Sequence, residues 1–490
     1  MNAPDLRWPA VTVPARHFIA NRFVASRDGA TLPMIDPSEG VAFAAIARGG
    51  AADIDDAVAS ARSARDGAWG RLAPAERGRR LAALAAAIGA HADELALLEA
   101  RDCGKPLRQA SADVAACARY FEFYAGAPDK LHGATIPYAD GYTVLTWREP
   151  HGVTGHIIPW NYPLQIFGRS VGGALAAGNA CVVKPAEDAC LSLLRVAELA
   201  ASVDLPEGTL NIVTGLGAEA GAALVEHPGV QHVSFTGSPA TGAQVAAAAA
   251  RRHCPVTLEL GGKSPQIVFA DADLEAALPA IVNAIVQNAG QTCSAGSRLL
   301  VERSLYEPLL ARLGERFAQL VAGPALADRD CGPLIRASQL ARVRGFLDEA
   351  ARNGIARVAA GQVANDAPPG GYYVAPTLLR DVPADAHLAC DEVFGPVLAA
   401  MSFDDEAHAI ALANATAYGL VAGVWTRDGA RQLRMARAVQ SGQVFVNNYG
   451  AGGGVELPFG GVKHSGYGRE KGFEALYGFT TLKTVVLRHG

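Results

Sequence analysis

The chain has 490 residues, of which half are hydrophobic and 19% are charged, the balance of a globular protein with about three domains. Lys and Arg number 43 against 48 Asp and Glu, so the formal charge is −5, and this excludes a basic protein that binds nucleic acid through its charge. No apolar run reaches the roughly 18 residues of a membrane span, so we expect no membrane partner.

The N-terminus and the cysteines indicate the compartment. The segment Met1-Asn-Ala-Pro-Asp-Leu-Arg-Trp8 lacks the basic start and apolar stretch of a signal peptide, so we expect a soluble, cytoplasmic protein. The 8 cysteines are scattered without a Cys-x-x-Cys pair, and no His pair has metal-ligand spacing, so we expect neither a disulfide framework nor a metal. All but Cys293 are expected to be buried small hydrophobic residues: Cys103, Cys117, Cys181, Cys190, Cys254, Cys331 and Cys390.

Helical patterning dominates roughly the first 130 residues, with apolar positions at helical spacing around Ala52–Val58 and Arg79–Ile88. The stretch Gly133–Trp147 has two alternating runs about Asp140-Gly141, which predicts a hairpin. Short β-rich runs with helical crossovers then predict a parallel, doubly wound sheet. The predicted strands are Gly155–Ile158, Ala180–Val183, Leu210–Val213, His232–Phe235 and Val256–Leu258.

A second α/β series begins near Pro265 with the predicted strand Gln266–Phe269 and runs to Val444–Asn447, and the tail Thr481–Leu487 has a further strand pattern. The fold class is therefore α/β, with three parts. We expect residues 1–128 and 150–260 to form a Rossmann-type domain, residues 261–464 a second α/β domain, and residues 129–149 and 465–490 a small β element.

Three residues together indicate covalent acyl chemistry. Cys293 lies among small residues in Asn288-Ala-Gly-Gln-Thr-Cys-Ser-Ala-Gly-Ser297, between an apolar helical run and a strand, and is the candidate nucleophile. Glu259 stands between two leucines at a strand end, where burial favours a base that works near neutral pH. Asn161, in the turn between a strand and a helix, can face an oxyanion. Each alone is more often a buried thiol, a solvated carboxylate or a turn former, so the argument depends on the combination.

Seven short motifs occur in one order along the chain, from about Phe18 to Lys483, and in this the sequence resembles the aldehyde dehydrogenase superfamily. The motifs are Pro159-Trp-Asn161, Val183-Lys-Pro-Ala-Glu187, Phe235-Thr-Gly-Ser238, Leu258-Glu-Leu-Gly-Gly-Lys263, Gly290-Gln-Thr-Cys293, Glu392-Val-Phe-Gly-Pro396 and Pro458-Phe-Gly-Gly461.

The resemblance implies that NAD is the cofactor and that 261–464 is the catalytic domain. The strict Gly-x-Gly-x-x-Gly fingerprint is absent, and the resemblance implies a modified site in which Lys184 and Glu187 meet the adenosine ribose. A carboxylate there repels a 2′-phosphate, so we expect NAD to be preferred over NADP. Alternatively, Lys184 and Glu187 are a surface ion pair and Ser238 an ordinary helix cap. The implied cofactor residues are Ile158, Trp160, Lys184, Glu187, Gly217, Gly237, Ser238, Glu392 and Phe394.

The resemblance implies oxidation of an aldehyde through a cysteine thiohemiacetal and a thioester, which Glu259 then helps to hydrolyse. Three alternatives stay open. A coenzyme A-acylating relative would have less need of Glu259, a cofactor-independent cysteine hydrolase would need a His base, and a silent scaffold would need no catalytic residues. In the family the hairpin and tail pair across subunits, which implies a homodimer or homotetramer.

The residues Tyr162, Gln165, Ile166 and Arg169 fall toward one side of the helix after Asn161, where we expect a substrate tunnel. We also place Phe459 in the substrate site. Arg169 would either bind a substrate carboxylate or be paired within the protein, and the second interpretation is favoured. With no bulky side chains in the run Gly452–Gly454 of the loop Gly450–Gly454, we expect a medium-sized or aromatic, mainly apolar aldehyde.

Overall fold

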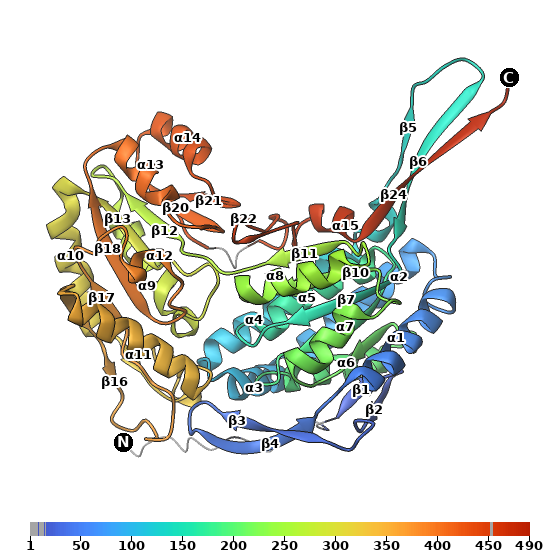
Figure 1. Ribbon diagram of the computed structural model, residues 1–490, viewed down its shortest axis with the longest axis horizontal. Coiled ribbons are helices and arrows are strands. Elements are labelled where there is room, and N and C mark those ends of the chain that lie inside the picture. Colours follow the sequence, from blue (N-terminus) through green and yellow to red (C-terminus); the bar gives the residue numbers. More distant parts are fainter. Residues whose placement is uncertain (1–7, 9–13, 15, 451–453) are drawn as a thin grey trace.

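The computed structural model describes residues 8, 14, 16–450 and 454–490. Two α/β lobes, each built on its own sheet, lie side by side, and a three-stranded sheet projects from one of them (Figure 1). Most of the N-terminal segment 1–8 and most of the glycine run 452–454 lie outside the described residues, so the expectations placed on them stay predictions.

The first lobe has an eight-stranded sheet in the order β2-β1-β9-β8-β7-β10-β11-β23, in which β7 to β11 pair in parallel. The strand order reverses at β7, so the sheet is doubly wound and all five predicted strands are confirmed. The parallel strands are β7 (Val153–Ile158), β8 (Ala180–Pro185), β9 (Leu210–Ile212), β10 (His232–Thr236) and β11 (Val256–Glu259).

Strands also occur where only helices were predicted, so the expectation for the first 130 residues was incomplete. β1 continues the first sheet by pairing antiparallel with β9, and at the other edge β23 pairs antiparallel with β11. The pair β3 and β4 forms a separate ribbon. These elements are β1 (His17–Ile19), β2 (Arg22–Val24), β3 (Thr31–Asp36), β4 (Val41–Ala47) and β23 (Gly466–Tyr467).

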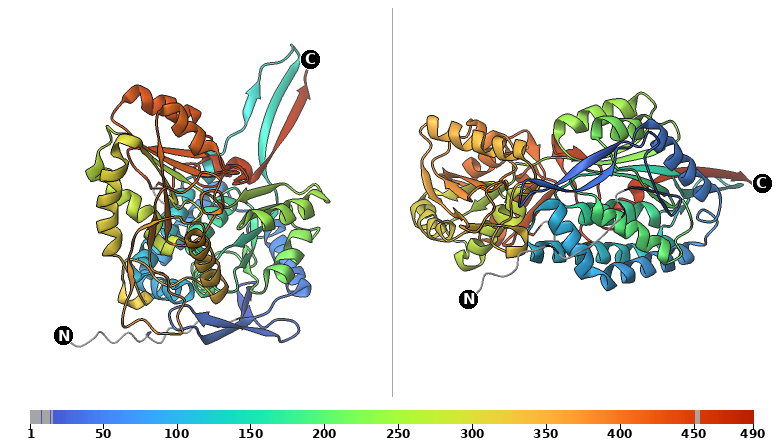
Figure 2. Two further views of the ribbon diagram at one scale, coloured as in Figure 1. Left: turned by 60° about the vertical axis from the view of Figure 1, so that its left-hand side comes forward. Right: turned by 90° about the horizontal axis from the view of Figure 1, so that it is seen from below.

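Helices cover both faces of the first sheet: α1, α7 and α8 lie on one face and α2 to α6 on the other (Figure 2). The helical patterns predicted at residues 52–58 and 79–88 lie in α1 and α2 and are confirmed. The helices are α1 (Ala51–Asp66), α2 (Pro74–Ala90), α3 (Ala92–Cys103), α4 (Leu107–Ala125), α5 (Pro163–Ala176), α6 (Leu191–Ser202), α7 (Ala222–Glu226) and α8 (Pro239–Ala250).

Within the described part of the chain, no single helix is long and apolar enough to cross a membrane. Of the described helices, only α2 and α3 taken together meet the length and composition of a span, and they are bent by 74° to one another.

The second lobe contains a seven-stranded sheet in the order β15-β17-β18-β13-β12-β20-β21, parallel except at β15. Helical crossovers place α9 and α10 on one face and α13 and α14 on the other. Its strands are β12 (Pro265–Val268), β13 (Arg298–Glu302), β15 (Arg357–Ala360), β17 (Thr377–Leu379), β18 (Val397–Phe403), β20 (Val421–Trp425) and β21 (Gln443–Val446). Its helices are α9 (Leu274–Val286), α10 (Arg303–Ala318), α11 (Ala337–Arg352), α12 (His387–Cys390), α13 (Glu406–Asn414) and α14 (Gly429–Ala438).

Small pairs of strands complete the connections: β14 (Val321–Ala322) with β16 (Gln362–Val363), and β19 (Tyr418–Gly419) with β22 (Val462–Lys463).

The projecting sheet has the order β24-β6-β5, so the predicted hairpin and C-terminal strand are both present. β24 pairs with β6 within the same chain, from Thr480 opposite Pro150 to Arg488 opposite Tyr142, so the expected pairing of hairpin with tail across subunits is wrong in this respect. The elements are β5 (Ala134–Ile136), β6 (Tyr142–Pro150), α15 (Glu474–Gly478) and β24 (Thr480–Arg488).

Candidate active site

A sharp turn holds Cys293 between α9 and β13. The short 3-10 helix Gln287–Gly290 contains Asn288 and Ala289 with φ of 48° and 52°. Gly290 follows with φ of 73°, and a Cβ there would stand 2.2 Å from the Gly395 carbonyl, so only glycine fits. The thiol is therefore presented by a rigid turn rather than by a helix face.

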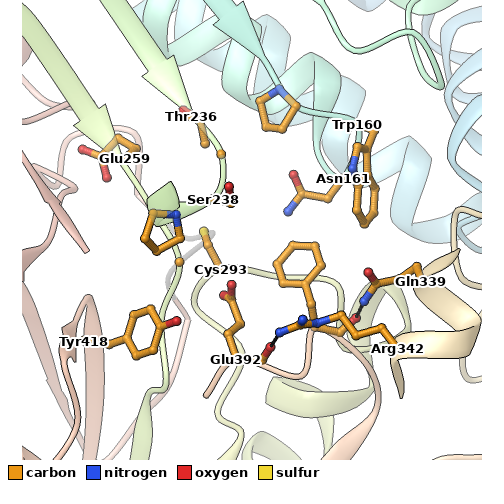
Figure 3. A pocket seen from close by; sticks show the side chains of 15 residues that line it. Trp160, Asn161, Thr236, Ser238, Glu259, Cys293, Gln339, Arg342, Glu392 and Tyr418 are labelled. Carbon is orange, nitrogen blue, oxygen red and sulfur yellow. Dashed lines mark hydrogen bonds between the residues drawn. The ribbon is translucent and has the colours of Figure 1, made fainter. Parts of the chain in front are cut away.

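Cys293 lines two cavities. The first, of about 310 Å³, is bounded by the turn after β7, the start of α8, the end of β11 and the loop that carries Glu392 (Figure 3). It is lined by Pro159, Trp160, Asn161, Thr236, Gly237, Ser238, Pro239, Glu259, Gly261, Cys293, Gln339, Arg342, Glu392, Phe394 and Tyr418. The three predicted catalytic residues thus meet in one space.

The second cavity, of about 70 Å³, lies on the α5 side of Cys293. All five side chains predicted to contact substrate line it together with the thiol. Its lining is Tyr162, Gln165, Ile166, Arg169, Gln287, Thr292, Cys293, Ser294 and Phe459.

Glu259 ends β11 and is only 1% exposed. Neither carboxyl oxygen has a hydrogen-bond partner among the described residues. Burial raises the pKa of Glu259 well above its ordinary value, against the opposing effect of the Arg169 cation. A buried carboxyl without partners in a cavity is placed to exchange a proton with whatever occupies that cavity.

Asn161 is held by the turn that carries the thiol. Its Nδ2 donates to the Gln291 carbonyl at 3.0 Å, while Asn288 Nδ2 donates to the Asn161 carbonyl at 2.9 Å. An amide has two N–H groups, so one is left for an oxygen in the cavity. These two bonds fix Asn161 relative to Cys293, two residues after Gln291.

The surroundings of Cys293 favour the protonated form of its thiol. Burial raises its pKa to about 12, although the Arg169 guanidinium acts in the opposite direction.

Of the other cysteines, six are buried as expected, whereas Cys390 is partly exposed, which corrects the expectation for that residue.

Arg169 is paired within the protein, as the favoured interpretation predicted. Its Nε lies 2.5 Å from Glu470 Oε2, and its Nη2 donates to Thr236 Oγ1 at 3.3 Å. The guanidinium also lies 4.9 Å from the centre of the Phe459 ring. Both charges are buried, so Glu470 already neutralises the cation that a substrate carboxylate would need.

The loop with Glu392 and Phe394 is fixed by α11. Gln339 Nε2 donates to the Phe394 carbonyl at 2.8 Å, and Arg342 Nη2 donates to the Glu392 carbonyl at 2.6 Å (Figure 3). Glu392 Oε1 accepts from the Gly262 N–H at 2.9 Å. Sequence reasoning missed Gln339 and Arg342, because side chains that bind backbone carbonyls leave no motif of their own.

The predicted cofactor residues divide into two groups. Five of them line the first cavity: Trp160, Gly237, Ser238, Glu392 and Phe394. Trp160 and Phe394 meet edge to face at 5.4 Å. Ser238 is the N-cap of α8, with its Oγ accepting from the Thr241 N–H, so the cap interpretation holds as well.

The other four lie outside the lining of this cavity. Ile158 and Lys184 are buried at the carboxyl ends of the adjacent strands β7 and β8, and Lys184 Nζ lies 3.2 Å from Glu187 Oε2. Gly217 opens the short helical turn Gly217–Gly221. Among the described residues, no group of three His, Cys, Asp or Glu side chains is arranged to hold a metal ion.

Comparison with known proteins gives extensive matches. The model of the aldehyde dehydrogenase family matches residues 23–485. "Aldehyde dehydrogenase family 2 member B4, mitochondrial" from Arabidopsis thaliana is 41% identical over 99% of this chain and 90% of its own length. Hydroxyisobutyraldehyde dehydrogenase from Mycolicibacterium austroafricanum is 40% identical over 96% of this chain and 93% of its own.

Solved structures agree with the fold. A crystal structure from Burkholderia cenocepacia, assigned to the aldehyde dehydrogenases, is 69% identical, with a TM-score of 0.97 over 97% of this chain and 100% of that one. The NAD⁺ complex of aldehyde dehydrogenase from Bacillus cereus is 39% identical, with a TM-score of 0.94 over 97% of each chain. The chain therefore belongs to the aldehyde dehydrogenase family.

Proposed function

We propose that the protein oxidises an aldehyde to a carboxylic acid with NAD and water, through a covalent intermediate on Cys293. One observation carries the proposal: the thiol lies where two cavities meet, with the unpartnered carboxyl of Glu259 and the amide of Asn161 in the larger one. Nucleophile, base and oxyanion donor are then supplied by three separate elements of the fold.

The steps follow from the positions of these groups. Glu259 takes the thiol proton, directly or through water, and the sulfur bonds to the carbonyl carbon while the C=O π electrons move to oxygen. The second N–H of the Asn161 amide and a backbone N–H would hold that oxyanion. When it re-forms the C=O bond, a hydride leaves the carbon and a thioester remains. Glu259 then passes the thiol proton to solvent and, as a carboxylate again, takes a proton from water, whose oxygen adds to the thioester carbon. As the C–S bond breaks, the sulfur leaves as a thiolate that takes a proton back, and the acid is released.

The first cavity fits a nicotinamide nucleotide. It joins the N-terminus of α8, which favours a pyrophosphate, to the aromatic side chains of Trp160 and Phe394 near the thiol. When bound, NAD supplies the acceptor for the hydride. We assign Lys184 and Glu187 to the adenosine ribose, where the Glu187 carboxylate favours NAD over NADP. One relative from Escherichia coli is named "NADP/NAD-dependent", so the preference for NAD rests on Glu187 and not on the relatives.

Three alternatives are weaker. A coenzyme A-acylating enzyme would not need a base for water, whereas Glu259 is buried at the thiol cavity. A cysteine hydrolase would need a His base, yet among the described residues no His lines either cavity that Cys293 borders. A silent scaffold would not need the pairing of Asn161 with the Cys293 turn.

The substrate we propose is medium-sized or aromatic and mainly apolar. Tyr162, Ile166 and Phe459 give the second cavity apolar walls, and Arg169 is already neutralised by Glu470. One similar protein is named for an aromatic aldehyde: "Benzaldehyde dehydrogenase, mitochondrial" from Antirrhinum majus, which is 41% identical.

We further propose that the projecting sheet, with residues 129–149 and 465–490, joins subunits into a homodimer or homotetramer. Large apolar side chains are exposed along it, which favours burial against a second copy. They are Ile136, Tyr138, Tyr142, Trp147, Leu482, Val486 and Leu487.

Replacing Cys293 tests the proposed function. Cys293→Ala should abolish NADH formation from aldehydes and keep the Kd for NAD within a fewfold, because the thiol forms the covalent bond but adds little to nucleotide binding. Cys390→Ala, at the other partly exposed cysteine, is the matched control and should keep its activity. Substantial NADH formation by the Cys293 variant would remove the central claim.

A further inference from the structure

Gln165 is the uncharged polar side chain that α5 contributes, beside Arg169, to the wall of the second cavity. Its Nε2 donates to Asp113 Oδ1 at 2.5 Å. Asp113 is on α4, is only 3% exposed, and is not part of the cavity lining. The amide of Gln165 is therefore held by Asp113, a residue outside the cavity lining.

A buried ion cluster keeps Asp113 in place. Lys105 Nζ lies 2.5 Å from Asp113 and 3.1 Å from Glu99, and the three residues are at most 3% exposed. Glu99 accepts from the Leu164 N–H in the first turn of α5 at 3.3 Å. Lys105 Nζ also lies 4.5 Å from the centre of the Tyr162 ring. The cluster therefore stabilises the first turn of α5, which contributes Gln165 to the cavity wall.

This arrangement sets the orientation of the Gln165 amide. An ionised carboxylate only accepts hydrogen bonds, so Asp113 must face the NH₂ group and cannot face the oxygen. The oxygen and nitrogen of a planar amide diverge from Cδ, so fixing Nε2 on Asp113 turns Oε1 away from α4. Gln165 therefore offers an occupant of the cavity the acceptor Oε1, beside the one N–H of Nε2 that Asp113 does not use.

Two other polar side chains of this wall, Tyr162 and Arg169, are already engaged. The Tyr162 hydroxyl shares a hydrogen bond with Thr292 Oγ1 at 2.9 Å, and Arg169 is paired with Glu470. Since Asp113 is likewise paired with Lys105, the charges near Gln165 are compensated within the protein. A neutral donor on the occupant then suits Gln165 better than an ammonium or a carboxylate, whose desolvation would find no opposite charge.

We propose that the preferred substrates are aldehydes with a neutral hydroxyl group on an apolar, ring-containing body, and that the hydroxyl donates to Gln165 Oε1. The inference rests on the proposed function and specifies its substrate class. Gln165 is then a specificity-determining residue, and Asp113 and Lys105 are positioning residues that act through it.

The wild-type enzyme gives the first test. 3- and 4-hydroxybenzaldehyde are compared with the corresponding methoxybenzaldehydes, which have an oxygen at the same place but no O–H. One hydroxy isomer should exceed its methoxy partner in kcat/KM by about 2- to 10-fold, the effect of one neutral hydrogen bond. Equal values for both pairs, or an advantage for methoxy, would overturn the inference.

Two variants locate the effect. Gln165→Leu keeps the bulk of the side chain but has no acceptor, so the ratio of hydroxy to methoxy substrate should fall to about one. Gln287→Leu, in the same cavity, is the matched control and should retain the wild-type ratio. A ratio that survives in Gln165→Leu, or that is lost in Gln287→Leu alone, would assign the recognition elsewhere.

The result separates this inference from the proposed function. A wild-type enzyme that forms no NADH from any of these aldehydes, nor from an aliphatic panel, would contradict the proposed function itself. An enzyme whose kcat/KM values for the unsubstituted and methoxy compounds equal those for the hydroxy compounds would contradict only the hydroxyl recognition. The wild-type ratio needs no variant to fold, so it decides the matter by itself.

Discussion

Replacing Glu259 by Gln should raise the stability of the protein toward neutral pH and at the same time lower its turnover. The carboxyl is 1% exposed and has no hydrogen-bond partner among the described residues, and its pKa is raised well above the ordinary value of about 4.3. The unfolded chain releases this proton near pH 4.3, whereas the folded protein retains it to higher pH. The free energy of unfolding therefore decreases as pH rises through this window.

The size of the effect follows from the linkage of proton binding to folding. Each pH unit between the two pKa values costs up to about 1.4 kcal/mol. Gln has no proton to lose and nearly the same shape, so Glu259→Gln lacks this cost. Relative to wild type, the variant should gain stability as pH rises from 5 toward the raised pKa of Glu259, by up to about 1.4 kcal/mol for each pH unit.

Urea unfolding of both proteins at pH 5 and pH 7 measures this gain, and Glu315→Gln, on the exposed side of α10, is the matched control. In parallel, turnover of Glu259→Gln should fall by about 10²–10⁴, because a positioned base is lost. A variant that is less stable than wild type at pH 7, or that hydrolyses the thioester at the wild-type rate, would refute the reasoning.

Three further changes test separate parts of the site. Asn161→Ala should lower kcat by about 10²–10³ in steady-state assays through loss of an oxyanion donor, and an effect confined to KM would make it a binding residue instead. Glu187→Gln should narrow the preference for NAD over NADP, since repulsion of the 2′-phosphate is removed; unchanged kcat/KM ratios for the two nucleotides would place Glu187 away from the ribose. Deleting the tail after Thr480 removes β24 and should give smaller oligomers, and an unaltered sedimentation profile would speak against that role.

The parallel strands of the first sheet could be predicted because each is a short apolar run followed by a helix. The N-terminal strands could not. β3 contains Pro33, and β4 reads Val-Ala-Phe-Ala-Ala-Ile-Ala, in which alanine favours a helix locally and pairing with β3 overrides it. The two-residue strand β23 exists only because it meets the edge of β11.

For the site, the residues within motifs were predictable because their spacing is fixed by one turn or one helix. Gln339 and Arg342 were not, since they act across the fold on the backbone of a distant loop. The hydrogen bond from Gln165 to Asp113 could not be predicted either, because it joins α5 to α4 between residues 52 positions apart in the chain.

The two cavities that meet at Cys293 also describe a way to inhibit the enzyme. An electrophile placed at the centre of an elongated molecule could react with the sulfur while one arm enters each chamber. The arm on the nucleotide side would add affinity but little discrimination, because the coenzyme that we propose for that chamber is used by many dehydrogenases. Selectivity would come from the opposite arm, which meets Gln165 and Phe459, and such a molecule would compete with both reactants at once.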